Sequence, residues 1–212
     1  HYEIGLVPEF GASSALLTVL IGILCACVGI FLCVSLHQCG HAYRKVFPNP
    51  YIRVLAGSAI FIVLTLLFPA RLYNGSGAQI IEMVFEGERI PVYAFLMKIL
   101  FTGVALGAGF KGGEIVPSFF IGATFGCLFG NLTGFEPSLC AAVGMISLFC
   151  GVTNCPITSL LISFELFGYD GMPYFLLAIP FSYMLSGYFG LYRSQKIVYS
   201  KYKTSYINKS TH

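Results

Sequence analysis

The sequence predicts an all-α protein embedded in a membrane, and three observations support this prediction. Of its 212 residues, 57% are hydrophobic and only 10% are charged, whereas about a quarter of the residues of a soluble domain are charged. The mean hydropathy is +0.81. Apolar runs follow one another along most of the chain, and so few ionisable groups could not cover a water-soluble fold of this size. The composition therefore disfavours the alternative, a soluble protein with an unusually large core.

The first two apolar runs resemble full membrane crossings. Residues 13–36 form a run long enough to cross a bilayer with some tilt, and the polar stretch HQCGHAYRK follows it. Residues 52–68 form a second run, which ends at Pro69. The next segment, residues 71–91, contains the turn residues NGSG and then one short amphipathic pattern. That pattern predicts a short helix lying at the membrane interface.

Most of the later apolar runs are shorter than the roughly twenty residues that a full crossing needs. They cover residues 92–108, 117–132, 138–152, 156–167 and 173–191. Short apolar segments interrupted by Gly or Pro indicate tilted and discontinuous helices that end inside the membrane. This pattern is typical of transport proteins rather than of simple anchors. Pro117 and Pro156 suit the first position of a helix, where the missing N–H is no loss.

Basic residues gather in two places, after the first apolar run and in the C-terminal tail: Arg44, Lys45, Arg53, Arg193, Lys196, Lys201, Lys203 and Lys209. The positive-inside rule predicts that both regions are cytoplasmic. Within the tail, residues 195–206 are predicted to form a last cytoplasmic helix. The net charge is only +3, and no nucleic-acid partner is predicted.

Seven of the eight cysteines lie inside or beside apolar runs, where cysteine behaves as a small hydrophobic residue. No disulfide framework and no cofactor are predicted. The cluster HQCGHA, with His37, Cys39 and His41, offers possible metal ligands, but no second ligand pair with zinc-site spacing follows it. A solvated helix end is the preferred interpretation, and no metal site is predicted.

Glycines recur at a spacing that favours close helix packing. Gly122, Gly126 and Gly130 follow one another at intervals of four residues, and Gly103 and Gly107 repeat the interval. Small residues at this spacing let helix backbones approach each other. The sequence therefore predicts a tightly packed bundle.

The stretch GFKGGEIVPSFFIGATFG, residues 109–126, places one carboxylate among glycines and apolar residues. A helix that begins at Val116 and Pro117 leaves its first backbone N–H groups unpaired, and its macrodipole adds partial positive charge there. The glycines let the backbone approach a ligand closely. Inside a membrane such a helix start is a ready anion site, and Gly113, Glu114, Ile115 and Val116 are its candidate residues. The alternative is that Glu114 is an acid favoured in the first turn of an interfacial helix.

These residues also carry a resemblance to a known family. KGGEIVPSFFIGATFG resembles the third anion-pathway segment, written G-x-F-x-P, of the CLC chloride channels and proton-coupled anion antiporters. YNGSGAQII is similar to the short helix that precedes that segment. AAVGMISLFCGVTNCPITSLLISFELFGYD resembles the hairpin that follows it, and SQKIVYSKY resembles the final segment that carries the central anion-coordinating tyrosine. Essentially the whole chain is covered, in order.

The resemblance implies that residues 1–212 are the C-terminal half of a CLC-type subunit, one of two inverted repeats, without the N-terminal repeat. The backbone amides of Glu114 and Ile115 would donate to an anion, and the hydroxyl of Tyr199 would donate from the intracellular side. Residues 157–189 would include much of this half's share of a homodimer interface. The implied location is the plasma membrane of a bacterial-type cell, and the chain without its N-terminal repeat is not expected to transport.

One departure from the family pattern points to the anion. Most CLC proteins carry Phe where this sequence has Ile115, and the acid before it, Glu114, resembles the fluoride/proton antiporter branch. This favours fluoride over chloride, with protons as the coupled ion. We expect Glu114 to be protonated during part of the cycle, with Lys111 or Lys98 offsetting its charge. Lys98 could equally be a structural partner of a backbone carbonyl, and Glu165 is interpreted as structural, through hydrogen bonds.

Three alternatives remain open at this stage. The first is a chloride channel or chloride/proton antiporter of the same fold. The second is a membrane enzyme with a metal at HQCGHA, although no enzymatic activity is expected. The third is a membrane scaffold that transports nothing.

Overall fold

The computed structural model describes residues 2–68, 73–192 and 194–211, and these residues form eight helices and one pair of strands. Pro69 and Arg193, which the sequence places at the end of the second apolar run and in the basic tail, lie outside the described residues. The helices are α1 (Ala12–Val46), α2 (Pro50–Leu67), α3 (Ala78–Phe85), α4 (Ala94–Ala108), α5 (Ile115–Thr133), α6 (Pro137–Thr153), α7 (Pro156–Phe167) and α8 (Met172–Leu185), and the strands are β1 (Lys196–Tyr199) and β2 (Tyr206–Ser210). The predicted order of the helices from α1 to α8 is confirmed, but the predicted last helix is not found among the described residues.

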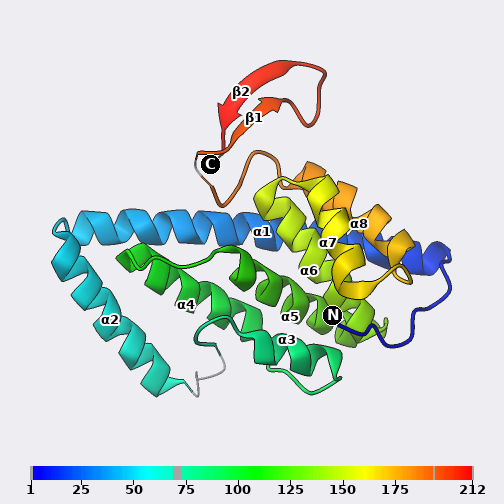
Figure 1. Ribbon diagram of the computed structural model, residues 1–212, viewed down its shortest axis with the longest axis horizontal. Coiled ribbons are helices and arrows are strands. Elements are labelled where there is room, and N and C mark those ends of the chain that lie inside the picture. The colour runs from blue at the N-terminus through cyan, green and yellow to red at the C-terminus, as the bar shows by residue number, and fades with distance from the viewer. Residues whose placement is uncertain (1, 69–72, 193, 212) are drawn as a thin grey trace.

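Helices α5 and α6 form the centre of the bundle, and glycines set how closely they approach (Figure 1). A Cβ atom on Gly126 would lie 2.1 Å from the carbonyl oxygen of Cys140, and one on Gly122 would lie 2.6 Å from the carbonyl oxygen of Gly144. On the other helix, Gly144 faces Gly122 in the same way. The backbones therefore touch along this seam, and the predicted packing role of the glycines is confirmed.

Helix α1 is longer than its apolar run, because it continues for ten residues past the predicted end, from residue 36 to Val46. It lies along α4, α6 and α8 (Figure 1). Gly103 and Gly107 of α4 pack against Cys39 of α1, and a Cβ atom on Gly107 would lie 3.1 Å from the Cys39 carbonyl carbon. Cys39 therefore faces α4, whereas His41 is exposed. Among the described residues no group of three potential metal ligands occurs, at HQCGHA or elsewhere.

Among the described residues, three helices, α1, α2 and α5, are long and apolar enough to cross a membrane. Helix α2 leans away from the bundle in Figure 1 and packs on α4, where Gly57 meets Ala108. Most of its apolar side chains are exposed, among them Tyr51, Ile52, Leu55, Leu66 and Leu67. Such a surface is costly in water, so α2 is a segment that lipid or another protein segment covers.

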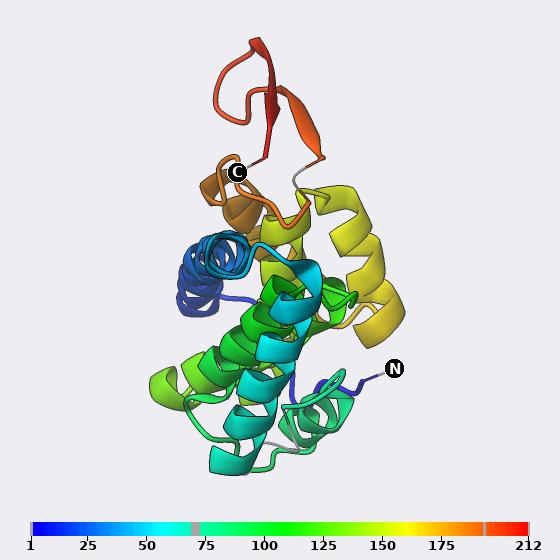
Figure 2. The same ribbon diagram turned by 90° about the vertical axis from the view of Figure 1, so that its left-hand side faces the viewer.

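The C-terminal tail corrects two predictions. Helix α8 ends at Leu185, not at residue 191, because Gly187 adopts the left-handed conformation with φ of 59°. Residues 195–206 are not a helix. They belong to a hairpin in which β1 pairs with β2 in antiparallel register, and this hairpin stands clear of the helices in Figure 2. The run KIVY is rich in β-branched and aromatic residues, which favour a strand over a helix.

One lysine fastens the hairpin to the bundle. The ammonium of Lys201 donates to the carbonyl oxygen of Tyr183 (2.7 Å), to the Ser186 hydroxyl (3.0 Å) and to the side-chain oxygen of Asn154. Asn154 and Ser186 are the C-caps of α6 and α8, so the cation sits at the negative ends of two helix dipoles. Burial lowers the pKa of Lys201 to about 8. The three acceptors offset the cost of that burial.

Candidate functional site

The start of α5 leaves backbone donors free. The helix begins at Ile115, one residue earlier than predicted, and Glu114 is its N-cap but makes no side-chain capping hydrogen bond. Within the described residues, the N–H groups of Gly113, Glu114, Ile115 and Val116 have no acceptor. These donors lie at the positive end of a helix dipole. The local geometry is therefore the one that the sequence predicts for an anion site.

A cavity of about 900 Å³ opens at this helix start, and it is referred to below as the main cavity. Its lining includes all four predicted residues of the helix start, together with residues from α1, from α4, from the loop before α5 and from the segment after α8: Leu36, His37, Gly40, Arg44, Leu106, Gly112, Leu191, Tyr192 and Ser194. The structure thus brings Gly113, Glu114, Ile115 and Val116 together at one cavity.

Helix α1 contributes two residues to the main cavity that the sequence analysis did not place in a site. His37 and Arg44 are seven residues apart, and Gly40 lies between them, so all three share one face of α1. The Arg44 guanidinium bonds the carbonyl oxygen of Gly40 at 3.0 Å, and His37 approaches the carbonyl oxygen of Leu191 at 3.4 Å. The signal in the sequence was the helical spacing of His37, Gly40 and Arg44, which continues one face of the helix past residue 36. Arg44 adds positive charge to the cavity.

Glu114 is half-buried at the main cavity and forms no ion pair within the described residues. The prediction that a lysine offsets its charge is not supported, because neither candidate pairs with it. Lys111 is exposed, and Lys98 donates to the carbonyl oxygens of Tyr73 and Gly75.

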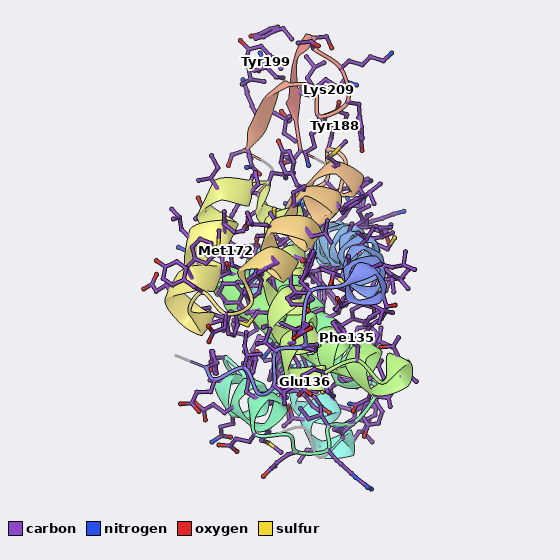
Figure 3. The ribbon with its side chains drawn as sticks, turned by 90° about the vertical axis from the view of Figure 1, so that its right-hand side faces the viewer. Phe135, Glu136, Met172, Tyr188, Tyr199 and Lys209 are labelled. Atoms are coloured by element: carbon purple, nitrogen blue, oxygen red, sulfur yellow. The ribbon has the colours of Figure 1, made fainter. Side chains whose placement is uncertain are left out.

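Tyr199 is not brought to the main cavity. It lies in β1, is 70% exposed, and its ring packs edge-on against Tyr206 with centroids 6.0 Å apart. Figure 3 shows it on the hairpin, beyond the ends of the helices. Tyr192 is the tyrosine that lines the cavity. The family resemblance selects Tyr199 from the sequence, but it did not predict that the tail folds here as a hairpin. The hairpin holds Tyr199 away from the main cavity.

Glu165 does not behave as a structural anchor. Its side chain is exposed on α7 and makes no hydrogen bond within the part of the chain that the structure describes. The described residues therefore do not support the interpretation that it holds α7 against its neighbours through hydrogen bonds.

Comparison with known proteins gives consistent results. The family model of the voltage gated chloride channels matches residues 2–187. A chloride/fluoride channel protein of Pseudomonas syringae pv. tomato is 31% identical over 208 residues, which cover 95% of this chain and 46% of that protein. A voltage-gated ClC-type chloride channel, ClcB, of Escherichia coli O9:H4 is 27% identical over 194 residues, with 87% and 46% covered.

A solved structure is similar over most of the chain. It is the crystal structure of a CLC-type fluoride/proton antiporter, with a TM-score of 0.86 and 27% sequence identity. The match covers 90% of this chain and 48% of that one. The chain therefore spans about half the length of the proteins that it matches.

Proposed function

This chain belongs to the voltage gated chloride channel family, and we propose from this premise that it is the C-terminal repeat of a subunit that transports anions across a membrane. It is an integral membrane protein, with three helices able to cross a bilayer. In the proposed complete subunit, an inverted N-terminal repeat faces this chain across the anion path. The chain without that repeat is expected not to transport, because the path is then open on one side.

One observation carries the proposal, the row of free backbone amides from Gly113 to Val116 at the main cavity. Amides fixed at a helix start are donors that replace the water of an anion without reorganising. The apolar bundle around them lowers the dielectric constant, which strengthens each such interaction. Arg44 at the same cavity favours the entry of anions over cations.

The proposed transported anion is fluoride, exchanged for protons. Fluoride is small and strongly hydrated, so its site must offer several short hydrogen bonds. The names of two similar proteins mention fluoride, and Glu114 supplies a carboxyl group at the helix start. A bare carboxylate would repel the anion, so Glu114 carries a proton while fluoride is bound. Chloride transport by the same fold is the alternative.

Anion efflux from liposomes that contain the complete subunit tests this function. We expect fluoride to leave much faster than chloride and to drive protons in the opposite direction, measured with ion-selective electrodes and a pH-sensitive dye. Efflux of chloride at the rate of fluoride would assign the chain to the alternative, and no efflux of either ion would contradict transport altogether.

The proposed subunit pairs with a second copy through residues 157–189. Helices α7 and α8 lie in this range and present an apolar groove lined by Pro156, Ile157, Leu160, Leu176, Ile179 and Pro180. Ile157 is 75% exposed. An apolar surface of this kind is typical of an interface. The C-terminal tail, with its lysines, is proposed to be cytoplasmic, in the plasma membrane of a bacterial-type cell.

Replacing Tyr199 with phenylalanine is expected to weaken anion binding by the complete subunit about tenfold, the loss of one hydrogen bond to a charged group. The hairpin leaves the cavity wall at Ser194, only five residues before Tyr199. The proposal therefore requires that the hairpin, which Lys201 fastens to the bundle here, lies differently in the complete subunit and brings the Tyr199 hydroxyl to the cavity. Anion titration followed by calorimetry measures the affinity. Tyr206→Phe, at the exposed cross-strand partner, is the matched control. A loss on Tyr192→Phe with none on Tyr199→Phe would assign the hydroxyl to Tyr192.

A further inference from the structure

Lys98 carries a buried positive charge that no acid of the described residues balances. It lies on α4 with 1% of its surface exposed, and within the part of the chain that the structure describes its ammonium donates to the carbonyl oxygens of Tyr73 (3.0 Å) and Gly75 (2.7 Å) and to no other atom. The ring of Phe120 lies 5.0 Å away. Carbonyl dipoles and a ring face attract a cation but carry no net charge. Buried ammonium groups are normally paired with an anion, so this one lacks its counter-charge.

The ammonium borders a second cavity of about 420 Å³, referred to below as the Lys98 cavity. The side chains around it include two lysines, Lys98 and Lys111, and three hydroxyls, those of Tyr73, Ser76 and Thr102, but no acid. An ammonium has three N–H donors, and two of those on Lys98 have protein acceptors. The lining therefore offers positive charge and hydrogen-bond donors, and it contains no acidic side chain that would balance that charge.

The Lys98 cavity adjoins the main cavity. The two share four lining residues, Leu106, Gly112, Gly113 and Val116, so the loop that leads into α5 separates them. Apart from its chain neighbours, Gly113 has no atom within 4 Å of where a Cβ would stand, so the space beside the backbone is open at this point. Two of the residues with free amides, Gly113 and Val116, thus line both cavities.

We propose that the Lys98 cavity is a second binding site for a small monovalent anion, and that this anion is the counter-ion of Lys98. The inference rests on the proposed function, because the ion is the transported one. The volume is large enough for an anion with several waters, since one water occupies about 30 Å³ in the liquid. The Lys98 cavity therefore holds a partly hydrated ion, and the amides of α5 take it after it has lost more of its water.

The alternative role of Lys98 is to brace the loop of Tyr73 and Gly75 through its two hydrogen bonds. Two variants separate the roles. Lys98→Gln keeps N–H donors for the carbonyls but removes the charge, whereas Lys98→Arg keeps both. If Lys98 only braces the loop, glutamine can take its place. If Lys98 supplies the charge that holds an anion, glutamine cannot.

Crystals of the complete subunit soaked in bromide provide the test, because anomalous scattering locates this ion. We expect bromide in both cavities of the unmodified protein, and we expect added fluoride to displace it from both. In Lys98→Gln, bromide should be lost from the Lys98 cavity, with at least a tenfold drop in occupancy, and remain at the α5 start. Lys98→Arg should keep both ions.

Several outcomes would overturn the inference. Bromide at the α5 start with none in the Lys98 cavity of the unmodified protein would refute the second site and leave the proposed function standing. Equal occupancy in Lys98→Gln would reduce Lys98 to a brace. Bromide at neither position would count against the proposed function as well. The unmodified protein decides the question even if the glutamine variant does not fold.

Discussion

Replacing Glu114 with glutamine is expected to abolish proton exchange by the complete subunit while anions still bind. Glu114 is the N-cap of α5, lies half-buried at the main cavity and has no ion-pair partner within the described residues. Glutamine has the same shape and cannot release a proton. The backbone amides that bind the anion stay in place, because they do not depend on this side chain. Proton flux driven by a fluoride gradient should fall by tenfold or more in liposomes.

The matched control is Glu165→Gln, which changes an exposed acid on α7, outside both cavities, by the same chemistry. Its proton and fluoride fluxes should equal those of the unmodified protein. If Glu114→Gln also leaves both fluxes unaltered, Glu114 has no part in the mechanism. If it removes fluoride binding altogether, the carboxyl group binds the anion rather than carrying the proton.

The helix starts could be predicted because they depend on local chemistry. Pro156 occupies the first helical position of α7, as predicted, whereas Pro117 is the third residue of α5 and not its first. The glycines before α5 mark where that helix can begin. The four residues of the proposed amide site are consecutive in the chain, so no knowledge of the tertiary fold was needed to group them. The family resemblance then indicated what this group binds.

The other parts of the site depend on contacts between distant segments. His37 and Arg44 reach the main cavity only because α1 continues past its apolar run, and packing of Cys39 against α4 accompanies that extension. The tail is a hairpin because residues near Lys196 pair with residues near Ser210. No pattern within either segment shows the partner. For this reason the polar HQCGHAYRK stretch was interpreted as a helix end, and the tail was interpreted as a helix.

The packing of α5 against α6 leaves no space for a side chain at Gly126. A Cβ there would lie 2.1 Å from the carbonyl oxygen of Cys140 and 2.8 Å from its carbonyl carbon. Both atoms belong to the backbone in the first turn of the buried helix α6, so they cannot move aside as the end of a flexible side chain could. The helices would have to separate along the seam that Gly122 and Gly144 also form.

Gly126→Ala is therefore expected to destabilise the protein by about 3 kcal/mol or more, at the upper end of the cost of overpacking a core. The displaced α5 would also carry its free amides away from the main cavity, so anion efflux should fall with the folded fraction. Unfolding in mixed detergents measures the stability.

Gly40→Ala is the control for stability, because it adds the same methyl group within α1, where the nearest atom is the flexible end of Arg44 at 3.5 Å. Alanine in a helix interior is favoured over glycine, so this control should melt no lower than the unmodified protein. Equal stability of the Gly126→Ala variant would show that α5 and α6 do not touch in the membrane, and a helix start held by that seam could not then fix the anion site.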